Sequence, residues 1–236
     1  MLAELTALLG ATRADSTPNN YVAACIEDNV LSKRTLVTRR TTAERLRELY
    51  ALDPGVTVFR LLRQFWSADP EARPLLACLC AQARDPLFRA TADSVLATKA
   101  GEVVTVDALC RLVDGQEAGR FGAKTLRSVA QNLASSWNQS GFLSGTKRKI
   151  RRRPVTTPTA AAYALALAAL AGARGQFLFS SHWVRLLDSP HDLVLDLARE
   201  ASRRGWIDFR AVGAVVEVKF PSLFTVREQE VLRGTH

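Results

Sequence analysis

The sequence predicts a mainly α-helical protein in which a helical bundle is followed by winged-helix-like units with short β-hairpins. Three observations lead to this fold class. Apolar residues recur at helical spacing through much of the chain, Asp-Pro steps interrupt the first hundred residues, and two helical segments are each followed by a glycine and two short extended segments. The chain has 236 residues, of which 47% are hydrophobic and 23% charged, so it can bury a core.

Residues 1–100 are expected to form the helical bundle. Proline disfavours helical backbone in the residue before it, so the Asp-Pro steps separate successive short helices. These steps lie at positions 53–54, 69–70 and 85–86. Thr41 and Glu44 have the spacing of a capping box, which predicts that one of the helices begins at Thr41.

Residues 101–158 are expected to form a winged-helix-like unit. An amphipathic helix is indicated by apolar residues at i, i+3, i+4 and i+7 spacing, namely Leu126, Val129, Ala130, Leu133 and Trp137. Gly141 ends this helix, and two extended segments follow, "FLSG" and the basic "RKIRRRPVTTP". A winged helix has the same order of elements: a helix, a glycine turn and then two short strands that form a basic hairpin.

Residues 159–236 are expected to form a second helical and winged-helix-like unit that ends in a β-hairpin. Ile207 and Phe209 alternate on one arm, Val216 and Val218 alternate on the other, and Gly213 lies near the bend. Residues 160–173 are apolar and rich in alanine. They are too few to span a bilayer, which needs about 20 residues, so a buried helix is expected.

The positive charge is concentrated in the middle of the chain. The net charge is +9, and residues 101–155 alone, with ten cations and four anions, account for +6. Six of the seven residues 147–153 are cationic: Lys147, Arg148, Lys149, Arg151, Arg152 and Arg153. This density predicts nucleic-acid binding. The run has no apolar periodicity, so we expect all six side chains to face solvent. The alternatives are a solvated loop and a targeting signal.

Two further groups of residues are candidates for DNA contact. The polar face of the helix before the basic run presents Lys124, Arg127, Ser128 and Gln131, and both Arg and Gln can pair with base edges in a major groove. An ordinary solvent-exposed face is the alternative. The second group precedes the helix expected at Thr41 and consists of Lys33, Arg34, Arg39 and Arg40. It can contact phosphates electrostatically or serve as a charged linker.

Other functions have weaker support in the sequence. Asp192, Asp196 and Glu200 form an acidic stripe that would repel phosphates, so the last helical segment is a poor DNA reader. Ser181 and His182 are close in sequence, but there is no nucleophile, phosphate-binding or zinc-protease motif, and we expect no enzyme. The four cysteines and three histidines lack the spacing of metal ligands, so no metal or cofactor is expected. The N-terminus lacks the features of a signal peptide.

Four stretches together resemble the BrxA family of BREX phage-defence systems. They are "EDNVLSKRTLVTRRTTAERL", "TLRSVAQNLASSWNQSGFLSG", "RRRPVTTPTAAAYALALAALAG" and "WVRLLDS…GAVVEV". The resemblance extends from about residue 20 to residue 218 and leaves out residues 1–17. It implies a small helical DNA-binding protein with a NusB-like N-terminal bundle followed by helix-turn-helix character. It also implies a role in antiviral defence, since BREX systems block phage replication and methylate host DNA.

Two functional hypotheses follow. The first is a non-enzymatic, cytoplasmic accessory protein that binds double-stranded DNA for phage resistance, beside other BREX proteins and without membrane association. The second is a protein-interaction adaptor or RNA-binding NusB-like module within the same defence complex. The oligomeric state is left open by the sequence.

Overall fold

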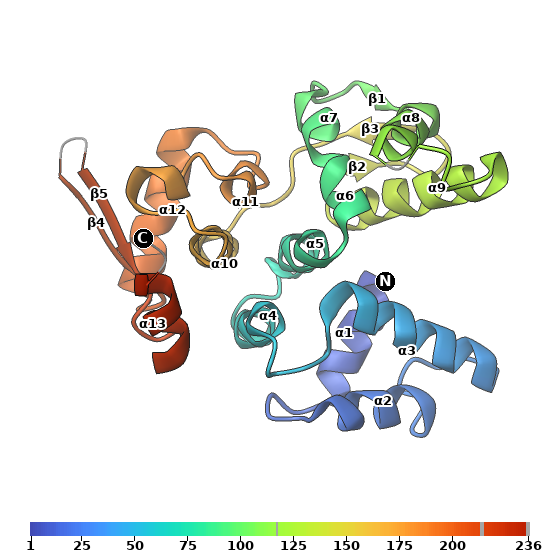
Figure 1. Ribbon diagram of the computed structural model, residues 1–236, viewed down its shortest axis with the longest axis horizontal. Coiled ribbons are helices and arrows are strands. Elements are labelled where there is room, and N and C mark those ends of the chain that lie inside the picture. Colours follow the sequence, from blue (N-terminus) through green and yellow to red (C-terminus); the bar gives the residue numbers. More distant parts are fainter. Residues whose placement is uncertain (117, 213–214, 235–236) are drawn as a thin grey trace. The chain divides into compact units, whose positions relative to one another are not determined.

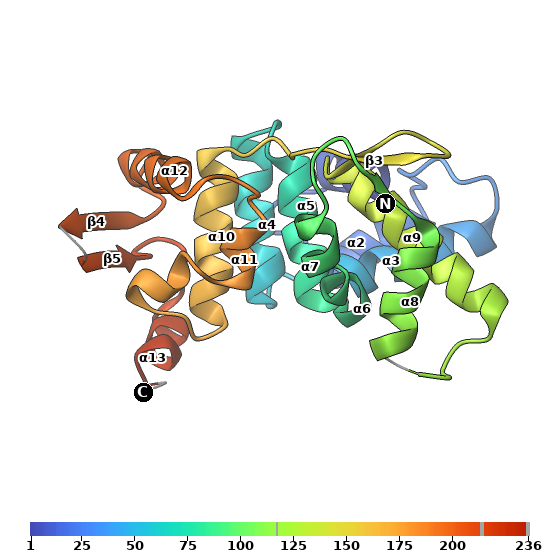
Figure 2. The same ribbon diagram turned by 90° about the horizontal axis from the view of Figure 1, so that it is seen from above.

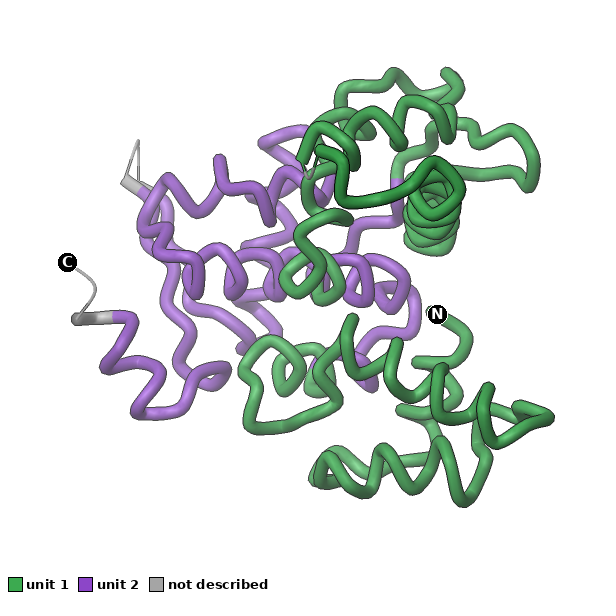
Figure 3. Tube along the Cα trace, turned by 45° about the vertical axis from the view of Figure 1, so that its right-hand side comes forward, with its two compact units in different colours: residues 1–64, 80–153 green, residues 65–79, 154–236 purple. Residues whose placement is uncertain are grey.

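Helices make up most of the chain, and its strands are short and antiparallel (Figure 1, Figure 2). The computed structural model describes residues 1–116, 118–212 and 215–234. This architecture confirms the predicted fold class. The chain forms two compact units: unit 1 comprises residues 1–64 and 80–153, and unit 2 comprises residues 65–79 and 154–236 (Figure 3). Unlike the three predicted segments, these units are not consecutive in the sequence.

The first part of the chain is a series of helices whose starts follow local capping rules. Thr17 accepts a hydrogen bond from the amide of Asn20 and Thr35 accepts one from the amide of Thr38, and in both cases the later side chain bonds the cap amide in return. The helices are α1 (Leu2–Ala11), α2 (Pro18–Ile26), α3 (Leu36–Tyr50), α4 (Thr57–Ala68), α5 (Arg73–Arg84), α6 (Pro86–Ala90) and α7 (Ala92–Ala97). Two of the three boundaries between the units fall within α4 and α5, and the third lies between residues 153 and 154.

Helix α3 begins at Leu36, so the prediction of a helix start at Thr41 is wrong. The Thr41 hydroxyl donates to the Val37 carbonyl at 3.0 Å, a bond that threonines make inside helices. Residues 36–40 contain neither glycine nor proline, so nothing prevents the helix from extending back to the earlier capping box.

The second part of unit 1 has the order of a winged helix. Its elements are β1 (Val103–Val104), α8 (Val106–Gln116), α9 (Ala123–Gln139), β2 (Leu143–Ser144) and β3 (Lys149–Arg151). The central strand β3 pairs antiparallel with β1 and with β2, so that Ile150 lies opposite both Val103 and Ser144. Helices α8 and α9 lie side by side (Figure 1, Figure 2). We call residues 143–153 the wing: β2, its turn, β3 and the two arginines that follow.

A glycine turn and an aromatic cluster attach the wing to α9. Gly141 has a φ of 84°, which lets its amide bond the Asn138 carbonyl and the next amide, of Phe142, bond the Trp137 carbonyl. The predicted helix end at this glycine is therefore confirmed. Trp137 is fully buried, its indole N–H donates to the Thr91 hydroxyl at 2.9 Å, and its ring centroid lies 4.8 Å from that of Phe142.

The wing turn requires glycine at position 145, and we expect Gly145→Ala to lower the unfolding free energy of unit 1 by about 1–3 kcal/mol. The φ of Gly145 is 98°, and a Cβ atom there would lie 2.3 Å from the Arg148 carbonyl oxygen. Gly122→Ala is the matched control, because Gly122 has a φ of −63° and open space around its Cα. Chemical denaturation of both variants measures their unfolding free energies. Equal unfolding free energies for Gly145→Ala and Gly122→Ala would contradict the prediction.

Unit 2 is built around a fully buried helix. Its elements are α10 (Pro158–Leu170), the 3₁₀ helix η1 (Gly175–Leu178), α11 (His182–Arg185), α12 (His191–Arg203), β4 (Asp208–Val212), β5 (Val215–Lys219) and α13 (Val226–Gly234). Every side chain of residues 159–169 is buried, which confirms the buried helix predicted for residues 160–173 over most of its length, and α10 contacts α11 and α12. Residues 171 and 172 lie beyond the end of α10 and are exposed. Within the described ranges, none of the helices has the length and apolar character needed to cross a bilayer.

Residues 65–79 belong to unit 2 because their aromatic and polar side chains contact it. The Phe65 ring centroid lies 5.6 Å from that of Trp206, in an edge-on arrangement. Burial by itself raises the pKa of the Asp69 carboxyl, but hydrogen bonds, among them one from Thr157 at the start of α10, lower it below its ordinary value.

The predicted hairpin is confirmed as β4 and β5, with Phe209 opposite Val218. Gly213, expected near its bend, lies outside the described residues.

Candidate nucleic-acid interface

Helix α9 has one buried and one exposed face. Ala130, Leu133 and Trp137 are buried, because α9 lies against α8 and β2. The opposite face is solvent-exposed and presents the four predicted residues Lys124, Arg127, Ser128 and Gln131. Their spacing of three, four and seven residues places them along one stripe of the helix. This stripe has the residue types and the exposure that base contacts in a major groove require.

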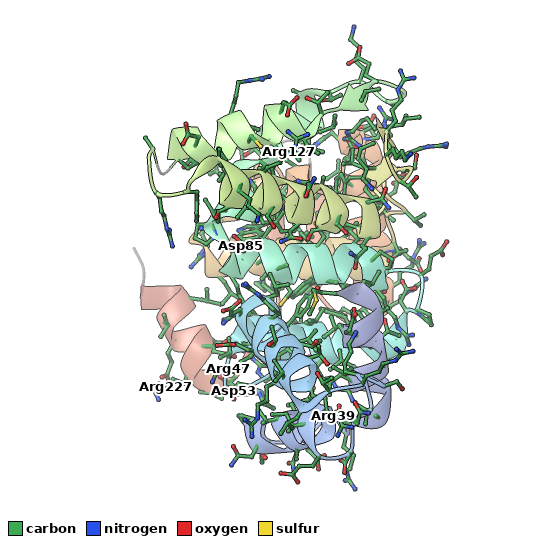
Figure 4. All side chains as sticks on the ribbon, turned by 90° about the vertical axis from the view of Figure 1, so that its right-hand side faces the viewer. Arg39, Arg47, Asp53, Asp85, Arg127 and Arg227 are labelled. Carbon is green, nitrogen blue, oxygen red and sulfur yellow. The ribbon has the colours of Figure 1, made fainter. Side chains whose placement is uncertain are left out.

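One residue of this stripe is held by a neighbouring helix. The Arg127 Nη1 atom donates to Oδ1 of Asp107, in the first turn of α8, at 3.0 Å. Figure 4 shows Arg127 where α8 and α9 run side by side. Lys124, Ser128 and Gln131 have no side-chain hydrogen bond or ion pair with any residue that the structure describes. Sequence reasoning missed Asp107 because it lies 20 positions away from Arg127, on another helix.

Three wing cations are fully available to a ligand. Lys147 and Arg148 lie in the turn between β2 and β3, and Arg153 follows β3; all three are exposed. Two others are exposed or half-buried and bond locally: the Lys149 ammonium donates to the Gly145 carbonyl at 2.7 Å, and Nε of Arg152 donates to a serine hydroxyl of β2 at 3.1 Å. Such local bonds still allow contact with a phosphate.

Arg151 differs from the other five, and the expectation that all six cations face solvent is wrong for it. Only 2% of its surface is exposed. Its Nε atom donates to the Val95 carbonyl at 2.8 Å, its Nη1 atom donates to the Arg152 carbonyl, and its guanidinium lies 5.4 Å from the centre of the Phe142 ring. The backbone N–H of Arg151 also donates to the Glu102 carbonyl.

The position of Arg151 explains its burial. Val95 is in the last turn of α7, where carbonyls lack partners within the helix and carry partial negative charge. Pairing of β3 with β1 places Arg151 at this helix end, where its guanidinium supplies both the donor and the positive charge. Arg151 is therefore a structural residue of unit 1 and has little surface left for DNA.

The second basic group is also divided by its contacts. The Lys33 ammonium forms an ion pair with Glu4 at 3.0 Å, and Arg39 donates to the carbonyls of Lys33 and Ile26. Arg39 is labelled in Figure 4. Arg34 and Arg40 remain exposed. Because α3 begins at Leu36, Arg39 and Arg40 are part of this helix and do not precede it. Arg34 and Arg40 are the members of this group best placed for phosphate contact.

Two of the three carboxylates of the acidic stripe, Asp196 and Glu200, are paired with arginines in or directly after α12. Asp196 bonds Arg199 at 2.6 Å, and Glu200 bonds both Arg203 and Arg204. The bond from Arg204 is the main cause that lowers the pKa of Glu200. The arginines of this helix are therefore occupied by their own carboxylates, and the cations available for a polyanion lie mainly in unit 1.

The cysteines and the other possible metal-binding or nucleophilic side chains were predicted to have no catalytic or metal-binding role, and their surroundings are as follows. No group of three or more His, Cys, Asp or Glu side chains is close enough there to hold a metal ion. The four cysteines are free thiols, and burial raises the pKa of Cys25 to about 11, which makes it a poor nucleophile. The Ser181 hydroxyl caps α11 by accepting the Val184 amide.

In comparisons with known proteins, no family model matches the chain, and no curated protein or solved structure is significantly similar to it.

Proposed function

We propose that the protein binds double-stranded DNA, without catalysis of its own, through the wing and the exposed stripe of α9. The observation that supports this best is the placement of exposed Lys147, Arg148 and Arg153 on a wing whose first strand contacts α9. Cations on such a wing neutralise phosphates, which supplies most of the affinity of non-specific binding. The polar stripe of α9 then faces the groove, where base edges can be reached.

The cellular role is proposed from the resemblance to the BrxA family. It supports a cytoplasmic accessory component of a BREX-type defence system, which acts on DNA beside the enzymes of that system. The exposed basic residues of unit 1 support the DNA-binding part of this proposal, and the reactions would belong to other components of the system.

A second candidate function is a protein-interaction adaptor or RNA-binding module. It is favoured by apolar side chains that α2 and α3 leave exposed: Val22 is 39% exposed, Leu36 49% and Val37 73%. Helices α2 and α3 contact each other, and exposed apolar side chains on neighbouring helices are candidates for a protein interface. In this case the N-terminal helices would dock a partner, and the wing would serve solubility or RNA contact.

A gel-shift series with the purified protein separates the two candidates. We expect binding to duplex DNA in the absence of metal and nucleotide, with affinity unchanged by EDTA, because the proposed surface consists of side-chain cations alone. Single-stranded DNA and RNA of the same length serve as competitors. Loss of binding in EDTA, a requirement for ATP or a clear preference for RNA would contradict the DNA proposal.

A further inference from the structure

We infer that Asp107 is a positioning residue that holds Arg127 for the recognition of guanine in the major groove. This inference rests on the proposed function and deepens it, because it assigns sequence preference to one pair of residues. The starting point is the bond between the Asp107 carboxylate on α8 and the Arg127 guanidinium on α9, at 3.0 Å. Asp107 joins the exposed stripe of α9 to a second helix of the same unit.

The bond leaves a useful part of the guanidinium unoccupied. Arg127 uses its Nη1 atom for Asp107, and its Nε and Nη2 atoms have no partner among the residues that the structure describes. These two atoms lie along one edge of a rigid planar fork, and arginine donors of this kind match the O6 and N7 acceptors of guanine. Arg127 is also 61% exposed, so this edge is accessible to a base.

Asp107 has an unfavourable charge for a DNA-binding surface. Its side chain is 68% exposed beside the stripe, and a carboxylate there repels phosphates. Orientation of Arg127 offsets this repulsion, because a long side chain that is already held loses less conformational freedom when it binds a base. Two opposite effects are therefore expected from Asp107: weaker binding to DNA in general and stronger discrimination for guanine.

A purely structural role for Asp107 would have a different signature. Asp107 lies in the first turn of α8, where a carboxylate is favourable because of the helix dipole. Loss of that interaction alone would change stability and general affinity without changing base preference. Asp114 provides a matched control, since it is also an exposed carboxylate of α8 but has no bond to Arg127.

The test uses duplexes selected by the wild-type protein from a randomised library. Each guanine of the selected duplex is replaced in turn by 7-deazaguanine, which lacks the N7 acceptor. The affinity for each modified duplex is then measured for the wild type and for four variants: Asp107→Ala, Arg127→Ala, the double variant and Asp114→Ala. For the wild type we expect one position at which the replacement weakens binding about 5- to 100-fold, the discrimination typical of a bidentate pair. Arg127→Ala should remove this penalty.

Asp107→Ala should reduce the penalty to less than about threefold, while its affinity for unrelated duplexes rises. In the Arg127→Ala background, loss of Asp107 should leave the remaining base preference unchanged. Asp114→Ala should keep the full penalty. The inference would be overturned if Asp107→Ala kept the full penalty, or if the wild type bound duplexes without any guanine preference; in either case the proposed DNA binding would stand. Absence of duplex binding by the wild type would instead contradict the proposed function and this inference with it.

Discussion

Simultaneous replacement of Lys147, Arg148 and Arg153 by alanine is expected to weaken duplex binding on the order of 10²- to 10³-fold near 0.1 M salt. These three side chains are the exposed wing cations without local hydrogen bonds among the described residues. If each contacts one phosphate, the slope of log affinity against log salt should become shallower by about 0.9 per contact, or about 2.7 in total. The loss should be similar on unrelated sequences, because phosphates carry no sequence information.

The matched control removes the same charge from another part of the chain. Arg199, Arg203 and Arg210 are exposed and form ion pairs with carboxylates of their own elements in unit 2. Their replacement by alanine should leave the salt slope nearly unchanged. The measurement is a salt titration of wild type and both triple variants on two unrelated duplexes. If the wing variant keeps its affinity and slope, or if the control loses as much, the wing is not the DNA-binding element.

Arg151→Ala is expected to lower the unfolding free energy of unit 1 by about 2–4 kcal/mol. The substitution leaves the Val95 carbonyl without its buried donor, removes the positive charge at the end of α7 and leaves a cavity beside the Phe142 ring. Arg152→Ala, at the next position, should change stability by less than about 0.5 kcal/mol because its side chain is exposed.

Amide hydrogen exchange of residues 80–153 measures this effect locally, which matters because the chain forms two compact units and a single global unfolding transition cannot be assumed for it. Faster exchange should appear in α7, β1 and β3 of Arg151→Ala. If Arg151→Ala and Arg152→Ala exchange alike, the structural role assigned to Arg151 is wrong. The two wing experiments therefore assign different roles to neighbouring arginines in one basic run: DNA contact to Arg153 and stability to Arg151.

The exposed apolar side chains on α2 and α3 allow a separate test of whether the N-terminal helices take part in DNA binding. A polar variant, Leu36→Gln with Val37→Thr, should leave DNA affinity unchanged if the wing and α9 form the interface. If the same variant abolishes duplex binding while the protein stays folded, the N-terminal helices take part in DNA contact as well. Both positions are exposed, so only small changes in stability are expected.

Local features of the fold could be predicted from the sequence. The apolar spacing of residues 126–137 predicts a helix with one buried face, and the structure shows that helix as α9. Gly141 predicts its end, and the alternation around Phe209 and Val218 predicts the terminal hairpin. The helix, its end and the hairpin each depend on residues that are close together in the sequence, where side-chain periodicity and the backbone preferences of single residues act directly. The concentration of cations in the wing is local in the same sense.

The roles of individual cations were decided by tertiary contacts. Arg151 is buried because strand pairing brings it to the end of α7, 56 residues earlier in the sequence. Lys33 is paired with Glu4, and Arg127 with Asp107, across distances at which the sequence contains no periodic signal. The sequence by itself therefore determined that residues 147–153 are strongly basic. Which cation meets solvent and which meets a carbonyl or a carboxylate depended on partners that only folding brings close, because the desolvation and pairing of a charge are set by its neighbours in space.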